Sequence, residues 1–510
     1  MKYLKILLGL AVCSLISACN SSPKKEAPQS SPNILFLFAD DMTYEAVRAM
    51  GNSTIETPNL DRIAAKGATF THAYNMGGWH GAICAASRTM LMSGRSLWPA
   101  WEVEQAFRKK DSTVLSQTWG RIMAKNGYDT YMSGKWHVVA PADYVFDEAR
   151  NIRPGMPGDS WPAFKRNEGK ILNEKNGNDL DLKNLMPVGY HRPNDENDKT
   201  WSPADTSFGG FWQGGKHWSE VLKDDALDYI EAASDKDKPF FMYLAFNAPH
   251  DPRQAPQSFV DKYPLENIKV PDNFLPLYPD KDSIGCSPGL RDEALAPYPR
   301  TAYAVKTHIQ EYYAIITHLD QQVGEILDAL EASGKMDNTY IFFSADHGLS
   351  VGNHGLIGKQ NMYDHSVRVP LMIAGPGIAA GSKISEDVYI QDLMPTGLEV
   401  AGIEKPSYVY FQSLLAMAKG SQEKGHLDAV YGAYRDLQRM IRKDGFKLLV
   451  YPKAKKLKLF DMEEDPKEIT NLATDPVYHE RLANMFLDLM DLQSKMKDTL
   501  DLHPLFNETI

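Results

Sequence analysis

The sequence predicts an α/β protein built around a large, mostly parallel β-sheet. Short apolar runs rich in aromatic and aliphatic residues are typical of strands that are buried on both faces of such a sheet. These runs cover residues 33–39, 128–134, 240–246 and 340–345. Helical patterns lie between them, at residues 59–66, 115–126, 221–233 and 309–333. Strands that alternate with helices predict an α/β sandwich, and 510 residues are enough to bury its core.

Polar residues of a catalytic type follow each apolar run directly. The four clusters are Asp40-Asp41, Lys135-Trp136-His137, Asn247-Ala248-Pro249-His250 and Asp346-His347-Gly348. In α/β proteins, ligands bind at the carboxyl ends of the parallel strands. The sequence therefore predicts that the four clusters converge on one edge of the sheet.

A metal site is predicted from the acidic members of these clusters. Asp40 and Asp41 are adjacent carboxylates, and charges this close repel each other unless a cation or a proton intervenes. A hard divalent cation prefers such oxygen ligands. Asp346 and His347 offer a second pair of ligands from another strand. One pair alone would favour a helix cap or a turn, but two pairs at one edge favour a metal.

The N-terminus has the features of an export signal. Basic residues precede the apolar run 6–16, which is too short to span a membrane, so we expect a signal peptide over residues 1–18. The following Cys19 completes a segment that resembles a bacterial lipobox, in which the Cys carries palmitate and other lipid. Residues 19–32 are rich in Ser, Pro and Lys and predict a flexible tether. We expect an exported bacterial lipoprotein, anchored in the cell envelope in the periplasm or at the cell surface.

Charge and cysteine content limit the remaining possibilities. A net charge of −11 argues against nucleic acid as a partner, and it leaves the lipid anchor as the expected membrane contact. Of the 4 cysteines, Cys13 leaves with the signal peptide and Cys19 carries lipid, so Cys84 and Cys286 remain. Two thiols do not make a disulfide scaffold. Cys84 is then either a small buried side chain or a site of covalent modification.

The residues around Cys84 carry a family resemblance. Cys84-Ala85-Ala86-Ser87-Arg88 stands at a predicted helix start, where anions bind readily. The segment resembles the signature of type I sulfatases of the alkaline phosphatase superfamily, in which a maturase oxidises the Cys to formylglycine, the catalytic nucleophile. Ala86 occupies the position where Pro is more common. The resemblance therefore implies a formylglycine-generating maturase as a partner and leaves its type open.

The resemblance also implies one Ca²⁺ ion per chain. In the family, two Asp after the first strand, an Asp followed by Asn or His after a late strand, and a formylglycine oxygen hold the ion. The matching residues here are Asp40, Asp41, Asp346, His347 and the modified Cys84. His347 stands where many members have Asn, and nitrogen is an unusual ligand for Ca²⁺.

The same resemblance implies roles for five further residues. Lys135 and Lys359 would bind the sulfate oxygens and offset the charge that develops in the transition state. Arg88 would hold the formylglycine. His137 would take a proton from the sulfated intermediate, and His250 would protonate the leaving alcohol. A single His is more often structural than catalytic, but these two follow predicted strands beside the other motifs.

Contacts to the rest of the substrate are expected from residues outside the shared motifs. His80 and His354 are candidates beside Lys135, His250 and Lys359, because they precede Cys84 and Lys359 closely in the sequence. The long segments 140–215 and 267–300 are the expected specificity loops. Aromatic residues there could stack on sugars or simply anchor the loops: Trp161, Trp201, Phe211, Trp212 and Trp218.

The resemblance extends over nearly the whole mature chain. Segment 364–373 resembles the return strand of the sulfatase sheet, and segments 445–451 and 459–466 resemble the hairpin of a smaller C-terminal α+β subdomain with an antiparallel sheet. The amphipathic segment 480–496 would pack on that subdomain. We expect an α/β/α sandwich of the alkaline phosphatase type over residues 33–410 and the subdomain over residues 411–510.

The implied activity is hydrolysis of the sulfate esters of a sulfated carbohydrate. Algal polysaccharides such as ulvan are the first expectation, and glycosaminoglycans are the second. A phosphonate or phosphodiester hydrolase of the same superfamily is an alternative, because such enzymes can share the formylglycine and the metal site. A lipoprotein that only binds sulfated glycans is another. The pair His137 and His250 favours an enzyme, because a binding protein needs no proton transfer.

Overall fold

The computed structural model describes residues 31–155, 192–199, 201–208 and 210–510. The signal peptide, the lipidation residue Cys19 and the aromatic residue Trp161 lie outside these ranges, so the expectations about them stay predictions. In the described part of the chain, no helix has the length and apolarity needed to cross a membrane.

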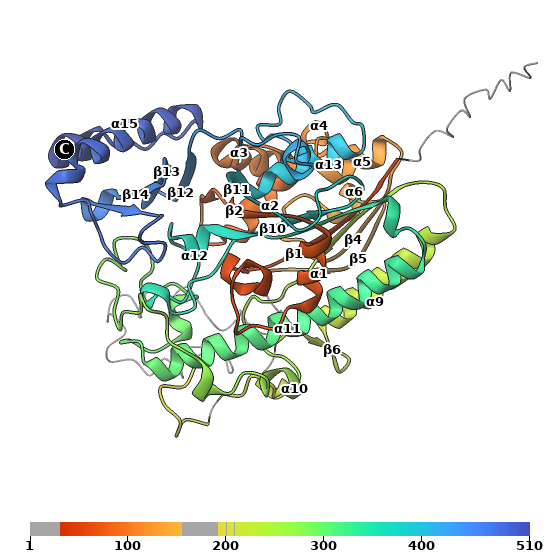
Figure 1. Cartoon of the computed structure of the whole chain (residues 1–510), viewed down its shortest axis with the longest axis horizontal. Helices are drawn as coiled ribbons and strands as arrows, with labels where there is room; N and C mark the ends of the chain where they lie inside the picture. Colours follow the sequence, from red (N-terminus) through yellow and green to blue (C-terminus); the bar gives the residue numbers. More distant parts are fainter. Residues whose placement is uncertain (1–30, 156–191, 200, 209) are drawn as a thin grey trace, which may run out of the picture.

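An eight-stranded sheet forms the centre of the molecule (Figure 1). Among its strands, β10 alone runs antiparallel to both of its neighbours, so the sheet is mixed and mostly parallel, as predicted. The spatial order of the strands is β11 (Ser382–Tyr389), β2 (Gly67–Tyr74), β10 (Arg368–Ala374), β9 (Thr339–Ala345), β1 (Asn33–Ala39), β8 (Phe240–Ala245), β4 (Asp129–Lys135) and β5 (Glu148–Arg153).

The four predicted apolar runs form four adjacent central strands, in the order β9, β1, β8 and β4. Every residue of β1, β8 and β9 is buried, which explains their unbroken apolar sequences. The strands pair in parallel and in register, for example Leu35 with Met242 on one side and with Ile341 on the other. Their carboxyl ends therefore lie side by side, as the sequence predicted.

Helices cover both faces of the large sheet (Figure 1). One layer contains α1 (Pro58–Lys66), α9 (Trp218–Ser234) and α11 (Ala302–Ala332), and α11 packs on the other two. The other layer contains α2 (Ile83–Ser93), α3 (Leu97–Arg108), α4 (Ser112–Leu115), α5 (Trp119–Lys125) and α13 (Leu393–Val400). The shorter helices are α6 (Ala142–Val145), α10 (Gln257–Val260), α12 (Asp364–Val367), α14 (Leu415–Ala418) and α16 (His503–Thr509). Strands β6 (Trp212–Gln213) and β7 (Lys216–His217) form a small hairpin before α9.

Two of the four predicted helices differ most from the structure in their bounds. The predicted helix 115–126 is divided into α4 and α5, and Asp111 caps the first by accepting hydrogen bonds from the backbone N–H groups of Thr113 and Val114. Helix α11 begins at Ala302 rather than at residue 309, because the Thr301 hydroxyl caps the earlier start by accepting from the N–H of Ala304.

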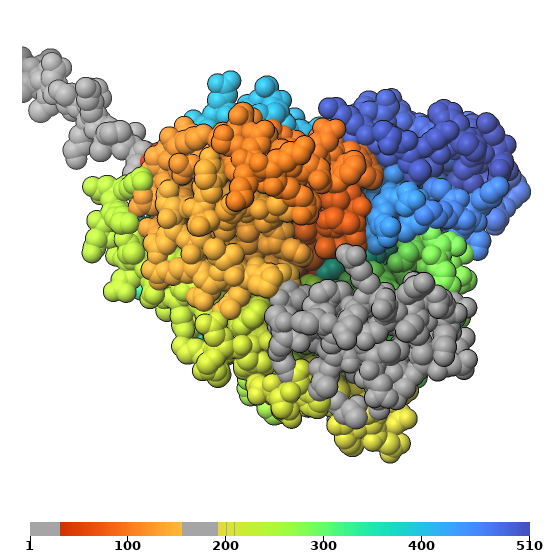
Figure 2. Space-filling model, turned by 180° about the vertical axis from the view of Figure 1, so that it is seen from behind, coloured from red at the N-terminus to blue at the C-terminus, as the bar shows by residue number. Residues whose placement is uncertain are grey.

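A second sheet joins the C-terminal part of the chain to the large sheet. Strands β12 (Val430–Tyr434), β13 (Gln438–Lys443), β14 (Phe446–Tyr451) and β15 (Lys456–Asp461) are antiparallel, and α15 (His479–Lys495) packs on them. Strand β12 also pairs in parallel with the short β3 (Gly77–Gly78), just before α2. In Figure 2 the blue C-terminal residues accordingly lie beside the orange-red N-terminal segment. The division at residue 410 stays a prediction.

Candidate active site

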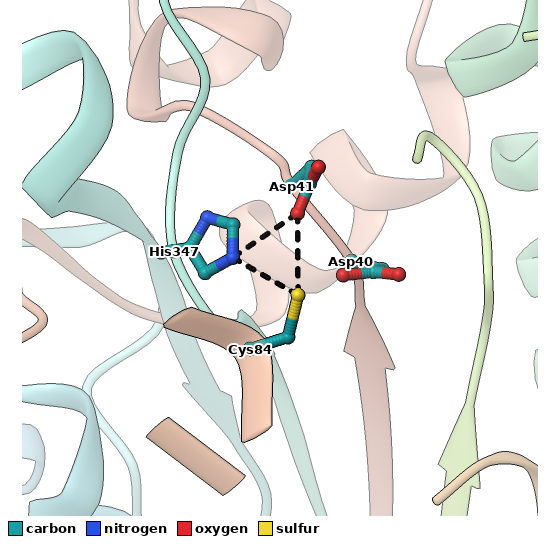
Figure 3. Close-up of side chains that lie close together, drawn as sticks. All are labelled: Asp40, Asp41, Cys84 and His347. Atoms are coloured by element: carbon teal, nitrogen blue, oxygen red, sulfur yellow. Dashed lines mark hydrogen bonds and ion pairs between the residues drawn. The ribbon is translucent and has the colours of Figure 1, made fainter. Parts of the chain in front are cut away.

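Side chains from several strand ends and from the start of α2 meet in one buried cluster (Figure 3). Asp40 and Asp41 follow β1, and His347 follows β9. Cys84 is the second residue of α2, and Lys135 is the last residue of β4. All five side chains are almost completely buried. The convergence on one sheet edge that the sequence predicted is therefore present.

The thiol of Cys84 is surrounded by positive charge. Its Sγ atom lies 3.2 Å from Nζ of Lys359 and 3.3 Å from Nε2 of His347. Burial by itself would raise the pKa of this thiol, but Lys135, Lys359 and His347 outweigh burial and hold the pKa well below its usual value. A low thiol pKa favours the thiolate, which is the reactive form of cysteine.

Asp40 carries a polar atom that has no partner. Its Oδ2 forms an ion pair with Lys135, whereas the buried Oδ1 accepts no hydrogen bond. Burial, followed by the negative charge of Asp346, raises the pKa of Asp40 well above its usual value. An unpartnered carboxylate oxygen in such a place fits a cation ligand, because a bound cation would offset both effects.

Asp41 is held in place from two sides. Its backbone adopts the left-handed conformation, with φ of 63°, and its carbonyl accepts a 2.6 Å hydrogen bond from the Tyr312 hydroxyl. Both carboxylate oxygens lie 2.8 Å from Nζ of Lys359, and Oδ1 lies 3.1 Å from Nε2 of His347. The strained backbone thus aims the carboxylate at Cys84.

Four of the five predicted metal ligands come together. Ligand atoms of Asp40, Asp41, Cys84 and His347 all lie within 4.8 Å of one another. This set contains carboxylate oxygens that suit a divalent cation, together with a nitrogen and a sulfur that are softer donors. The residues present therefore fit a metal ion.

The fifth predicted ligand, Asp346, borders this group, with its Oδ1 3.8 Å from Nε2 of His347, and its role as a ligand stays a prediction. Its Oδ1 accepts hydrogen bonds from the backbone N–H groups of Asp41 (3.1 Å) and His347 (3.0 Å). Its Oδ2 accepts a 2.8 Å hydrogen bond from Nε of Arg88. Burial opposes ionisation, but Arg88 and other cations hold the pKa of Asp346 below its usual value. Asp346 thus fixes the backbone of two ligand residues.

Arg88 connects the start of α2 with two strands. One guanidinium nitrogen, Nη1, donates to the carbonyl of Lys135 (2.8 Å) and to the hydroxyl of Tyr243 (3.2 Å). The other, Nη2, is buried and has no hydrogen-bond partner. This free donor points to an oxygen acceptor that the bound state would supply.

The two predicted catalytic histidines reach the cluster from different strands. His137 follows β4 with φ of 53°, and its ring packs against Gly155, where a Cβ would lie 2.6 Å from the ring. Burial lowers the pKa of His137, although a hydrogen bond with Cys84 opposes this effect. His250 follows β8, and its Nε2 lies 3.8 Å from Asp41. Burial and the charge of Lys359 lower the pKa of His250.

The two predicted substrate contacts outside the motifs make other interactions. His80 lies 3.7 Å from Glu104 at the surface, with 37% of its side chain exposed. His354 stacks on Tyr363 at 3.9 Å between ring centres, and its Nε2 is 3.2 Å from Nδ2 of Asn273. Both roles in substrate binding stay predictions.

Sequence reasoning missed the residues that hold His250. Its Nδ1 lies 2.7 Å from the carbonyl oxygen of Asp251, and the Asp251 carboxylate forms an ion pair with Arg291. Asp292 binds the same Arg291 and also accepts a 2.7 Å hydrogen bond from Gln360, which follows Lys359. Asp251 could have been predicted, because it follows His250 directly in the sequence. Nothing local in the sequence indicates Arg291 or Asp292.

The described aromatic residues of the long loops mainly anchor those loops. Phe211 is fully buried. Trp201 is 8% exposed, and its indole N–H donates a 3.1 Å hydrogen bond to Glu311. Trp212 donates to Gln254, and the guanidinium of Arg153 lies 4.3 Å from the ring centre of Trp218.

Comparison with known proteins gives the family. Residues 32–403 match the sulfatase family, which is more than half of the chain. The chain belongs to the sulfatase family. Residues 352–495 also match the C-terminal region of N-sulphoglucosamine sulphohydrolase. This sulfatase is therefore a sulfuric ester hydrolase.

Characterised relatives align over most of the sulfatase chain. An arylsulfatase from Clostridium perfringens is 29% identical over 480 residues, covering 88% of this chain and 92% of the relative. An N-acetylglucosamine-6-O-sulfatase from Bacteroides thetaiotaomicron is 28% identical over 528 residues, covering 97% and 91%. An ulvan-active sulfatase from Formosa agariphila is 24% identical over 494 residues, covering 94% and 84%.

Solved structures confirm the fold class. A protein in complex with its substrate D-glucosamine-2-N,6-O-disulfate superimposes with a TM-score of 0.66 at 22% identity, covering 92% of this chain and 99% of the other. A phosphonate monoester hydrolase from Agrobacterium radiobacter gives a TM-score of 0.65 at 19% identity, covering 91% and 96%. At these identities the likeness concerns the fold alone.

Proposed function

We propose that this sulfatase hydrolyses sulfate esters of a sulfated carbohydrate, using a formylglycine made from Cys84 and a bound Ca²⁺ ion. The observation that supports it best is the position of Cys84 at the start of α2, between Lys359, His347 and Asp41. A cysteine with no disulfide partner among the described residues and with cations on two sides fits a modified nucleophile that faces an anion.

Asp40, Asp41, Asp346, His347 and the modified Cys84 would hold the ion, and Asp346 would also fix the backbone of Asp41 and His347. When bound, the cation supplies positive charge beside the nucleophile, and the hydrated formylglycine supplies the attacking oxygen. Lys135 and Lys359 would bind the sulfate oxygens, since both ammonium groups are buried in the same cluster. Buried cations of this kind stabilise charge that develops on an anionic transition state.

The two histidines would transfer protons at different stages. His250 would protonate the leaving oxygen of the sugar, with Asp251 and its partner Arg291 fixing the ring. His137 would take the proton that allows sulfate to leave and the aldehyde to form again. Burial lowers the pKa of His137, which keeps it neutral, as a base requires. His250 has to be protonated to act as the acid, and the charges of Asp41 and Asp251 oppose the lowering of its pKa by burial and Lys359.

The names of the relatives support a carbohydrate substrate. One relative acts on N-acetylglucosamine 6-O-sulfate and another on ulvan, and the two are 28% and 24% identical to this chain. Our sequence-based preference for ulvan over glycosaminoglycans stays a prediction, because one relative is named for ulvan and another for an N-acetylglucosamine sulfate. The fold shared with a phosphonate monoester hydrolase makes that activity the alternative to test.

The location and partners of the protein are a further part of the proposal. The lipobox-like segment around Cys19 supports an envelope lipoprotein, whose lipid is its membrane contact. A formylglycine-generating maturase able to accept Ala86 would act before the enzyme is active. Labelling with a palmitate analogue, lost in Cys19→Ala, tests the anchor.

Turnover on a defined panel tests the proposed function. The panel contains sulfated oligosaccharides from ulvan and from glycosaminoglycans, an aryl sulfate and a phenyl phosphonate monoester, each with added Ca²⁺. We expect sulfate release from at least one oligosaccharide and much slower phosphonate cleavage. Cys84→Ser, made in a host that matures only Cys, is the matched inactive control. Faster cleavage of the phosphonate than of every sulfate would overturn the proposal.

A further inference from the structure

A surface groove lies outside the catalytic cluster, between α3, the segment before α14 and the end of α15. Its volume is about 560 Å³, which lies within the range of ligand sites in proteins. None of the residues of the catalytic cluster lines it. The described lining residues are Arg95, Ser96, Pro99, Glu102, Val103, Ala106, Val114, Ser407, Tyr408, Tyr410, Lys495 and Lys497.

The groove is cationic although the protein is acidic. Arg95, Lys495 and Lys497 line it together with one acidic residue, Glu102, whereas the whole chain has a net charge of −11. Lys497 makes no ion pair with any residue in the described ranges, and Lys495 is exposed, with a 2.7 Å ion pair to Asp491. Such a local excess of positive charge attracts an anionic partner.

Two aromatic rings stand beside these cations. The guanidinium of Arg95 lies 3.7 Å from the ring centre of Tyr408. This cation–π contact fixes the guanidinium at the side of the groove. Tyr410 is 40% exposed, although its backbone is held in place. The segment is fixed because the Tyr410 N–H donates a 2.8 Å hydrogen bond to the carbonyl of Gly94 at the end of α2.

The close fit at Gly94 keeps this wall rigid. Gly94 has φ of 69°, and a Cβ at this position would lie 2.9 Å from a methyl group of Val409. Arg95 also donates to the carbonyl of Ser93 and to the side chain of Gln117. The guanidinium of Arg95 and the ring of Tyr408 are thus ordered before any ligand arrives, so that binding through them costs little side-chain entropy.

We propose that this groove is a second binding site for a sulfated polysaccharide chain, separate from the site that cleaves sulfate. Rings that stack on sugar faces and cations that meet sulfate groups together match that chemistry. Polymer held there would raise the local concentration of sulfate esters around the enzyme. The inference extends the proposed function, because it adds a site for the same class of substrate.

The test separates charge from stacking. The first variant is Lys495→Gln with Lys497→Gln, and its matched control is Lys383→Gln with Lys424→Gln, which removes equal charge from other exposed positions. The second is Tyr410→Ala. Binding is measured by electrophoresis in native gels that contain dextran sulfate, neutral dextran or polyaspartate. All variants carry Cys84→Ser, so no turnover occurs.

We expect the lysine pair to weaken binding of dextran sulfate roughly tenfold, with the control pair unchanged. Tyr410→Ala should weaken binding of dextran sulfate but not of polyaspartate, which has no sugar ring to stack. Equal binding by all variants would overturn the inference. In a parallel sedimentation assay with vesicles of anionic lipid, loss of binding by the lysine pair there but not on dextran sulfate would overturn the inference in favour of a membrane. Because these binding measurements need no catalysis, their outcome does not depend on whether the proposed sulfatase substrate is correct.

The effect on turnover provides a second measurement. The same variants, made with Cys84 intact, should release sulfate from an aryl sulfate at the unaltered rate. On a sulfated polymer their KM should rise several-fold, with kcat retained. Unchanged KM on every sulfated polymer would contradict a role of the groove in holding substrate.

Discussion

Arg88 donates a 2.8 Å hydrogen bond to Asp346, and both side chains are fully buried. The pair joins the start of α2 to the end of β9, so that Cys84 and His347 keep their relative positions. Removing one partner of a buried ion pair leaves an uncompensated charge and costs about 3–5 kcal/mol. The ion pair therefore stabilises the fold and fixes the geometry of the site.

Loss of the guanidinium should destabilise the protein. We expect Arg88→Ala to lower the free energy of unfolding by about 3 kcal/mol or more, measured by urea denaturation. Arg121→Ala, at a surface position that is only partly buried, is the matched control and should change it little. An Arg88→Ala protein as stable as the wild type would show that the pair does not hold the site together.

Cys84 should be present as formylglycine in active protein. Peptide mass spectrometry of material from a host with a suitable maturase should show the aldehyde and its hydrate at Cys84, and unmodified thiol at Cys286. Cys286 is buried beside the backbone of Gln360, and burial raises its pKa, so it is an internal control. Full activity in a preparation that contains only unmodified Cys84 would contradict the modification.

Metal binding should be visible without any assay of activity. Calcium at about 100 times its Kd should raise the free energy of unfolding by about 2.7 kcal/mol, seen as a higher Tm. Asp40→Asn should lose most of this increase, because the unpartnered Oδ1 of Asp40 lies within the ligand set. Asp237→Asn, at an exposed position, should retain it. A wild-type Tm that changes with neither calcium nor chelator would count against the metal site.

The two histidines should differ in how their loss depends on the leaving group. His250→Ala should cost roughly 100- to 10,000-fold on an alkyl sugar sulfate and far less on an aryl sulfate, because a phenolate leaves without a proton. His137→Ala should instead stall after one turnover on both substrates and accumulate a sulfated enzyme, visible by intact mass. Equal losses of activity on both substrates for both variants, with no sulfated adduct, would contradict our assignment of the two roles.

Glu468 should make stability fall as the pH rises towards neutral. Burial, followed by the charge of Asp364, raises the pKa of Glu468 to about 7, although Lys447 opposes this shift. The folded protein then binds a proton that the unfolded chain has already lost, so stability declines between the ordinary Glu pKa and about pH 7. Asp364 acts in the opposite sense only at lower pH, because its pKa is held below the usual value.

The difference in Tm between pH 5 and pH 8 measures this effect. Glu468→Gln should reduce the decline in Tm, because Gln can still accept the backbone N–H of Asp364 and carries no charge. Glu464→Gln, at an exposed position nearby, should leave the pH dependence as it is in the wild type. A decline of the same size in the Glu468→Gln protein would contradict the shifted pKa.

The sequence alone was sufficient for the central strands and for the residues at their ends. Apolar runs such as residues 33–39 and 340–345 report burial on both faces, which is a local property of the chain. Parallel strands in one sheet bring their carboxyl ends to one edge, so the proximity of Asp41 and His347 could be predicted without coordinates. The segment around Cys84 supplied the family by resemblance.

Tertiary structure alone decided how these residues contact one another. The hydrogen bonds of Asp346 with Arg88 and with the backbone of Asp41 join segments far apart in the chain, and no local pattern encodes them. The pairing of β3 with β12 and the ion pair of Asp251 with Arg291 join segments far apart in the chain. Such contacts form because a buried charge or backbone polar group needs a partner, and only the folded protein brings that partner within reach.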